Sequence, residues 1–202
     1  MVPELGNKNV ARRGNAVTKF LARLAFKLSG WQVTGEIPDC PKFVAIGAPH
    51  TSNWDWVIGM MLMYAVGIKF SFLIKKSVFV PVFGPILKFL GGIPVDRSAA
   101  NGIVGDAVRA FKSADRLILA ITPEGTRKSD GVLKTGFYRI AVKAKVPILV
   151  VGIDYPNKRF DTGLFLEASL SEEEVFSKIH EYLETMEGRN AGFLGSKKKG
   201  AQ

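Results

Sequence analysis

The 202-residue sequence has few of the residues on which disulfide frameworks and metal centres are built. It holds one cysteine, Cys40, and two histidines, His50 and His180. A single cysteine excludes an internal disulfide and fits a reducing compartment. Two isolated histidines without a cysteine cluster do not form a zinc-site pattern, so we expect no metal ion.

A long uninterrupted hydrophobic run is also missing. Residues 56–74 and 77–95 approach the length of a membrane span, but glycine and lysine interrupt both stretches, and proline interrupts the second. The apolar segment near the N-terminus contains Arg23 and Lys27, and no small-residue cleavage pattern follows it. We therefore expect neither a spanning helix nor a secretory signal, and we expect the protein to stay inside the cell.

The nucleophiles of covalent acyl-enzyme chemistry are a third absence. No Gly-x-Ser-x-Gly segment is present, and Cys40 lies in a turn flanked by Pro38 and Pro41. Neither pattern supplies an activated serine or cysteine, so any acyl transfer by this chain is expected to be direct.

What the sequence does have is apolar residues, at 47%, and positive charge, at a net +10. The length fits one domain with a core, and the apolar excess must face something other than water. The charge favours acidic lipid, an acidic carrier protein or nucleic acid. Without a glycine-rich phosphate loop or an aromatic–basic platform, nucleic acid is not an expected partner. A noncatalytic basic protein that binds membrane or nucleic acid stays a remote alternative.

Residues 15–29 have the spacing of a basic amphipathic helix, and we expect the polar residues 1–14 before it to be mobile. Apolar and basic residues recur on different helical faces: Val17, Phe20, Leu21, Leu24 and Leu28 on one, and Lys19, Arg23 and Lys27 on another. Such a helix either packs on the domain with its basic stripe in water or lies on anionic lipid as an interfacial anchor. The apolar excess of the whole chain favours the anchor.

From residue 42 onward, short apolar runs alternate with helical segments. This alternation predicts an α/β fold, a single domain with a mixed, largely parallel central sheet flanked by helices. Ser171 and Glu174 predict the capping box of a late helix that runs to about Met186 and carries His180 without a catalytic role. The expected strands are 42–48, 70–74, 92–95, 116–121, 147–154 and, at an edge, 160–168; the other expected helices are 53–66, 100–112 and 137–144.

The first of these strands ends in Ala-Pro-His-Thr-Ser-Asn-Trp-Asp, residues 48–55, which puts His50 on a loop and Asp55 in the first turn of a helix. A carboxylate that accepts from one ring nitrogen leaves the other free to take a proton from a hydroxyl, as in a catalytic triad. The alternative is structural, because Ser52 and Asp55 also fit a capping box, with His50 as a bystander. Spacing alone does not separate the two.

Two further segments place charged groups at the ends of apolar strands. Residues 121–127, Ile-Thr-Pro-Glu-Gly-Thr-Arg, predict a turn in which Thr126 and Arg127 offer donors suited to a phosphate. Residues 91–97, Gly-Gly-Ile-Pro-Val-Asp-Arg, end in Arg97. Taken singly, each segment is typical of a surface turn or a structural ion pair, although open α/β sheets bind ligands at the carboxyl ends of their strands.

In their order and spacing these motifs resemble the glycerolipid acyltransferase family, in particular the 1-acylglycerol-3-phosphate (lysophosphatidic acid) acyltransferases. The resemblance runs from about Trp31 to about Asp154 and includes Lys75-Lys76 before an apolar segment and residues 146–148, Val-Pro-Ile. The chain then divides into an N-terminal arm with a membrane-associating helix (1–30), an acyltransferase domain (31–187) and a disordered basic tail (188–202). The sequence departs from the family pattern at Thr122, Pro94 and Val150, and at Ser77 and Val78 after the lysines.

The resemblance implies roles for the site residues. His50 would be the catalytic base and Asp55 its partner. The phosphate end of the acceptor would be bound by Arg97, Glu124, Gly125, Thr126 and Arg127. For the oxyanion that forms during transfer, the sequence offers Lys75 or backbone N–H groups near Gly125.

The implied reaction moves a fatty acyl group from acyl-CoA or acyl carrier protein to the hydroxyl of a lysophospholipid. 1-Acylglycerol-3-phosphate is the favoured acceptor, and another lysolipid, a lyso-aminolipid or a glycolipid stays open. No metal or cofactor is needed, and the expected location is peripheral, at the cytoplasmic face of a membrane. The apolar stretches 56–68 and 77–90 are expected to line an acyl slot.

Overall fold

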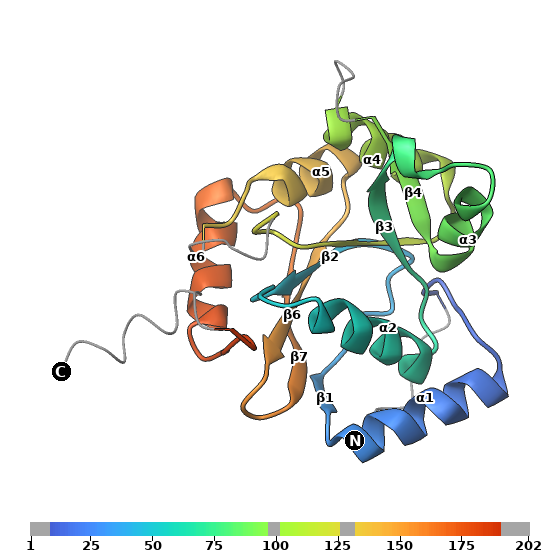
Figure 1. Ribbon diagram of the computed structural model, residues 1–202. Helices are drawn as coiled ribbons and strands as arrows, with labels where there is room; N and C mark the ends of the chain where they lie inside the picture. The colour runs from blue at the N-terminus through green and yellow to red at the C-terminus, as the bar shows by residue number, and fades with distance from the viewer. Residues whose placement is uncertain (1–8, 97–101, 126–131, 191–202) are drawn as a thin grey trace.

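A seven-stranded sheet forms the centre of the protein (Figure 1). The computed structural model describes residues 9–96, 102–125 and 132–190. All neighbouring strands are parallel except β6 and β7, so the predicted α/β domain with a mixed, largely parallel sheet is confirmed. The spatial order is β1 (Gln32–Gly35), β7 (Arg159–Leu166), β6 (Ile148–Asp154), β2 (Lys42–Ala48), β5 (Leu117–Ile121), β3 (Phe70–Lys75) and β4 (Gly92–Val95).

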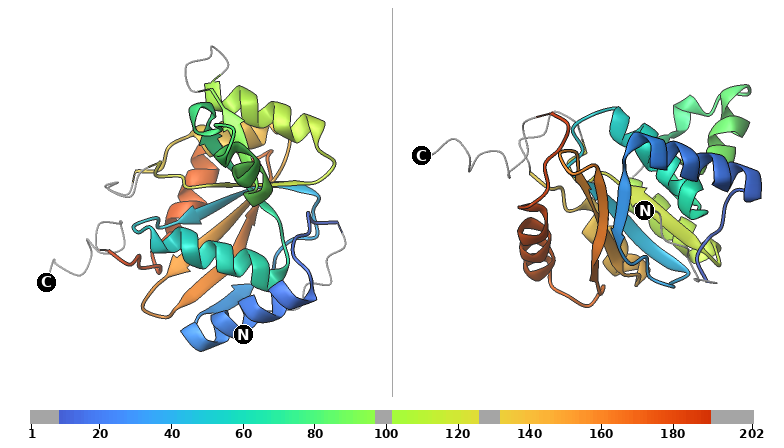
Figure 2. Two further views of the ribbon diagram at one scale, coloured as in Figure 1. Left: turned by 45° about the vertical axis from the view of Figure 1, so that its right-hand side comes forward. Right: turned by 90° about the horizontal axis from the view of Figure 1, so that it is seen from below.

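Helices cover both faces of this sheet (Figure 2). On one face lie α1 (Ala16–Ser29) and α2 (Trp54–Val66), and on the other lie α4 (Gly102–Ser113), α5 (Gly136–Ala144) and α6 (Glu172–Leu183). Side chains alternate between the faces of a strand. In β2, therefore, Val44 and Ile46 pack with the second group of helices, whereas Phe43 and Ala45 pack with the first.

Three elements differ from the sequence predictions. Strand β1 was not predicted. The strand at the end of the chain, β7, is not at an edge, because β1 pairs with it in parallel and takes the edge position itself. Helix α3 (Phe83–Leu90), which follows a short 3-10 turn (Lys76–Val78), was not predicted. Its sequence contains Gly84 and Pro85, which favour a turn. However, Pro85 lies in the first turn of α3, where the missing N–H would have no partner within the helix.

The segment before α1 is packed rather than mobile over its described part, residues 9–14. Val10 is fully buried, and Arg12 forms a β-bridge with Ile68. The guanidinium of Arg13 lies over the ring of Phe89 at 4.7 Å and donates to the carbonyl of that residue. This contact joins the start of α1 to the end of α3.

Helix α1 packs on α2, but its predicted apolar face is not the face that makes this contact. Phe26 is its buried residue, and Arg23 donates to the Ala65 carbonyl at the end of α2. The predicted apolar face points outward, with Phe20 65% and Leu28 78% exposed. In the described residues, no helix combines the length and the apolar content that crossing a bilayer requires.

Candidate functional site

Three neighbouring parallel strands, β6, β2 and β5, bring their carboxyl ends to one edge of the sheet. Tyr155 directly follows β6, His50 lies two residues beyond β2, and Glu124 lies three residues beyond β5. The parallel register therefore brings together side chains that are far apart in the sequence. The edge is the one at which open α/β sheets bind ligands.

His50 and Asp55 make the contact that their spacing allows. Nδ1 of His50 lies 3.0 Å from Oδ2 of Asp55, and Asp55 is almost completely buried. The same oxygen accepts the backbone N–H groups of Thr51 and Ser52, each at 2.9 Å. The structural alternative holds only in part: Asp55 accepts the Ser52 N–H as in a capping box, but His50 is not a bystander, because the same carboxylate contacts its ring.

The electrostatics of the site favour an ionised Asp55. Burial raises the pKa of the Asp55 carboxyl, but hydrogen bonds from His50, Tyr155 and Ser52 together outweigh burial and hold that pKa below its ordinary value. An ionised carboxylate on Nδ1 leaves Nε2 of His50 unprotonated when the ring is neutral. This is the arrangement that a general base requires.

Glu124 lies beneath the histidine loop, where its Oε1 accepts the backbone N–H of His50 at 2.9 Å. The side chain is 2% exposed, burial raises its pKa, and Oε2 has no hydrogen-bond partner among the described residues. The turn that delivers it ends at Gly125, which has a φ of 68° and donates its N–H to the Thr122 carbonyl. Glycine suits this position, because residues with a Cβ rarely adopt this backbone conformation.

A cavity of about 550 Å³ opens beside this pair, between α2 and the sheet. It exists because the residues facing it there are small: Ala45 and Gly47 in β2, Ala120 in β5 and Gly59 in α2. Trp56, Met60 and Phe72 add apolar walls. His50 and Asp55 also line the cavity, so the polar pair and an apolar space share one site.

Other predicted site residues lie apart from this pair or outside the described ranges. Lys75 ends β3, which β5 separates from β2, and its exposed side chain makes no hydrogen bond or ion pair with another described residue. Arg97, Thr126 and Arg127 lie outside the described residues. The N–H of Gly125, considered for the oxyanion, is already bonded within its own turn. Of the two apolar stretches, 56–68 lines the cavity and 77–90 does not.

Two contributions to the site were missed in the sequence. The hydroxyl of Tyr155 donates to Oδ1 of Asp55 at 2.5 Å. Asn190 donates through its side chain to the Thr51 carbonyl at 2.8 Å, and its backbone N–H donates to the Thr51 hydroxyl at 3.2 Å. Residues 188–190, predicted as the start of a disordered tail, are therefore packed on the His50 loop. No described group of His, Cys, Asp and Glu residues is arranged to hold a metal ion.

Comparison with known proteins connects this site to a family. Comparison with curated proteins gave no match. The solved crystal structure of the 1-acyl-sn-glycerophosphate (LPA) acyltransferase PlsC from Thermotoga maritima is similar in fold, with a TM-score of 0.59 and 20% identity over 92% of this chain and 79% of that chain. A sequence model of the family described as Acyltransferase matches residues 33–154, which is more than half of the chain. The chain therefore belongs to the Acyltransferase family.

Proposed function

We propose that this acyltransferase moves a fatty acyl group from a thioester to the free hydroxyl of a lysophospholipid. The favoured acceptor is 1-acylglycerol-3-phosphate, which would give phosphatidic acid. The observation that carries the proposal is the 3.0 Å contact of His50 with Asp55 at the wall of an apolar cavity. Direct acyl transfer needs both a base and a space for a hydrocarbon chain, and here the two lie together.

In the proposed mechanism, Nε2 of His50 takes the proton of the acceptor hydroxyl while Asp55 stabilises the imidazolium that forms. The oxygen attacks the thioester carbonyl, and the tetrahedral intermediate collapses to expel the thiolate. The proton on His50 is then available to the leaving sulfur. No metal or cofactor takes part, and the acyl donor, acyl-CoA or acyl carrier protein, is a co-substrate. We propose that Lys75, two strands away from His50, supports the oxyanion by extending its long, exposed side chain toward the site.

The family resemblance supports a phosphate-binding role for Arg97, Gly125, Thr126 and Arg127. Glu124 fits a different task, because its carboxylate accepts from the His50 backbone. We propose that Glu124 fixes the histidine loop rather than contacting the phosphate itself. An acceptor without a phosphate, such as a lyso-aminolipid or a glycolipid, stays the alternative, and a lysolipid screen distinguishes the two.

A screen of radiolabelled acyl thioesters against a panel of lysolipids, read by thin-layer chromatography, tests the reaction and the acceptor together. His50→Ala should abolish transfer. The matched control is His180→Ala, because His180 lies on α6, where Nδ1 contacts the Phe176 carbonyl. Near-normal turnover by His50→Ala, or transfer to no member of the panel by the unaltered protein, would refute the proposal.

We further propose that α1 and α3 rest on an anionic membrane surface, at the cytoplasmic face. The outward apolar side of α1 and the exposed Phe83 and Phe89 of α3 are joined through Arg13. Exposed apolar groups beside Lys19 and Lys88 are typical of an interfacial helix. Vesicle flotation tests this, with Phe20→Ser expected to weaken binding and Val142→Ser, exposed on α5, as the control. Equal flotation of both variants would contradict it.

A further inference from the structure

The two oxygens of the Asp55 carboxylate have separate partners. Oδ2 accepts from Nδ1 of His50 and from the N–H groups of Thr51 and Ser52, all within 3.0 Å. Oδ1 accepts from the hydroxyl of Tyr155 at 2.5 Å. A rotation about the Cβ–Cγ bond that moved Oδ2 away from the imidazole would have to break the contacts at both oxygens. The Tyr155 hydroxyl therefore adds to the barrier against that rotation, through the oxygen that His50 does not contact.

We propose that Tyr155 is a positioning residue for acyl transfer, whose hydroxyl holds the Asp55 carboxylate so that Oδ2 faces His50. This inference rests on the proposed function. It extends the His50–Asp55 pair to a third residue that comes from a different strand end, 100 residues further along the chain.

The ring of Tyr155 is itself fixed from several sides. Its backbone directly follows β6, and its N–H donates to the Glu187 carbonyl at 2.9 Å. The indole of Trp31 meets the phenol edge-on, with ring centroids 5.0 Å apart. A hydroxyl on such a fixed ring can orient a carboxylate, whereas one on a mobile side chain would only follow it.

The charges around the pair are consistent with a donor that stays protonated. Burial and the neighbouring Asp55 raise the pKa of Tyr155 above its ordinary value, although Arg189 acts in the opposite direction. Asp55 is faced by His50 and Tyr155, and the buried Glu124 is near enough to interact with it through charge. Near neutral pH, the phenol therefore donates and the Asp55 carboxylate accepts.

The test is Tyr155→Phe, which keeps the ring against Trp31 and removes one oxygen atom. Because a hydrogen bond to a charged group is lost, kcat should fall about 10- to 100-fold. KM for both substrates should change less than about threefold, since Tyr155 contacts neither in the proposed mechanism. The low-pH limit of kcat should move to higher pH, because an Asp55 carboxylate that has lost one of its donors is a more basic partner for the imidazole.

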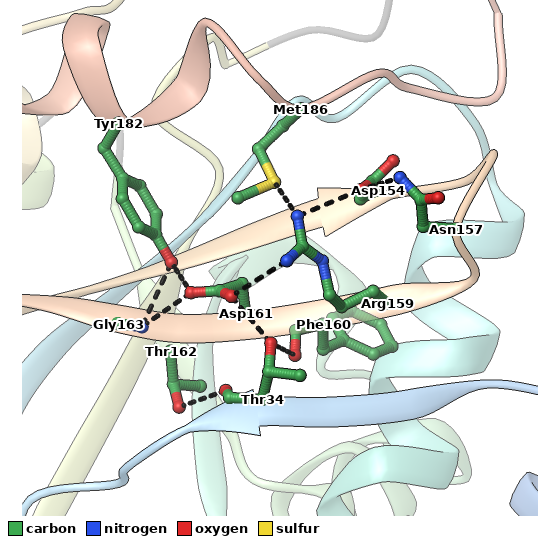
Figure 3. Close-up of polar contacts among 10 residues, drawn as sticks. All are labelled: Thr34, Asp154, Asn157, Arg159, Phe160, Asp161, Thr162, Gly163, Tyr182 and Met186. Carbon is green, nitrogen blue, oxygen red and sulfur yellow. Dashed lines mark hydrogen bonds and ion pairs between the residues drawn. The ribbon is translucent and has the colours of Figure 1, made fainter.

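The chain offers a matched control in a second tyrosine–aspartate pair. Tyr182 of α6 donates to Asp161 of β7, as Figure 3 shows, and Tyr182 does not line the cavity. Burial and Asp161 likewise raise the pKa of Tyr182. Tyr182→Phe removes the same hydroxyl from the same kind of pair, so it should leave kcat and the pH profile unchanged while any general effect on folding is shared.

Three outcomes decide between the inference and the function on which it rests. Activity and a pH profile equal to those of the unaltered protein in Tyr155→Phe would overturn the role of Tyr155 alone. Absence of transfer by the unaltered protein would remove the proposed function. In that case the NMR signal of the His50 Nδ1 proton still tests the contact: it should shift or broaden in Tyr155→Phe but not in Tyr182→Phe, and an unchanged signal overturns the inference.

Discussion

Replacing Gly59 with leucine tests whether the cavity holds the acyl chain. Gly59 lies in α2 and lines the cavity, and a Cβ built on it would meet no atom within 4 Å. A leucine side chain at this position should therefore enter the empty space without moving neighbouring residues. Because leucine is a better helix former than glycine, α2 itself should be stabilised by up to about 1 kcal/mol.

The expected effect follows from the carbon atoms that the new side chain adds. Leucine brings four carbons into a space that an acyl chain would otherwise use. Each displaced methylene loses about 0.8 kcal/mol of burial, which is roughly fourfold in kcat/KM. If four methylenes are displaced, the longest chains lose about 3 kcal/mol, or roughly two hundredfold, while chains short enough to stop before residue 59 lose nothing.

The assay is a competition among saturated acyl thioesters of increasing length with one lysolipid acceptor, read as the ratio of products. Gly136→Leu is the control, because a Cβ on Gly136, at the start of α5, also meets nothing within 4 Å but does not face the cavity. The preferred length should decrease only in Gly59→Leu. An unchanged length profile, or an equal loss at all lengths, would refute the assignment of the cavity to the acyl chain.

Two further predictions concern the polar residues of the site. In Asp55→Asn, the amide oxygen should take the Oδ2 position, where three donors converge, so His50 keeps its tautomer but loses the opposing charge. Because the charge-assisted hydrogen bond contributes about 3 kcal/mol, kcat should fall about 100-fold. A loss of less than fivefold in steady-state kinetics would contradict this. Glu124→Gln should raise the melting temperature while lowering kcat/KM. Since burial raises the pKa of Glu124 in the folded state, its ionisation destabilises the fold increasingly as pH rises through that pKa. The gain of the variant should therefore be larger at pH 8 than at pH 4 in thermal melts, and a constant gain would contradict the burial of that charge.

The sequence alone was sufficient to predict the elements that leave an apolar run or a capping motif. Strands β2, β5 and β6 appear as apolar runs, and the capping box of Ser171 and Glu174 marks the start of α6 as predicted. The four-residue strand β1 could not be found in this way, because Val33 is its only buried residue and its partner β7 lies more than 120 residues away.

At the site, local spacing made the contact of His50 with Asp55 one of two alternatives, since a loop and the first turn of a helix can bring them together, and the family resemblance favoured it. Tyr155 and Asn190 reach the same loop only through the order of the strands and the path of the chain after α6. A polar aromatic residue directly after an apolar strand was the one signal available for Tyr155. The acceptor of the His50 backbone N–H was likewise hidden, because nothing local shows that Glu124 is buried.

The support of α2 by α1 has a geometrical consequence for substrate delivery. One side of α2 rests on α1, and another side forms a wall of the cavity beside His50. If α1 lies flat in the headgroup layer, the cavity is held about one helix diameter, roughly 10 Å, above it. A lysolipid leaving the leaflet would then travel a distance shorter than its own tail, and the tail would never have to be fully hydrated.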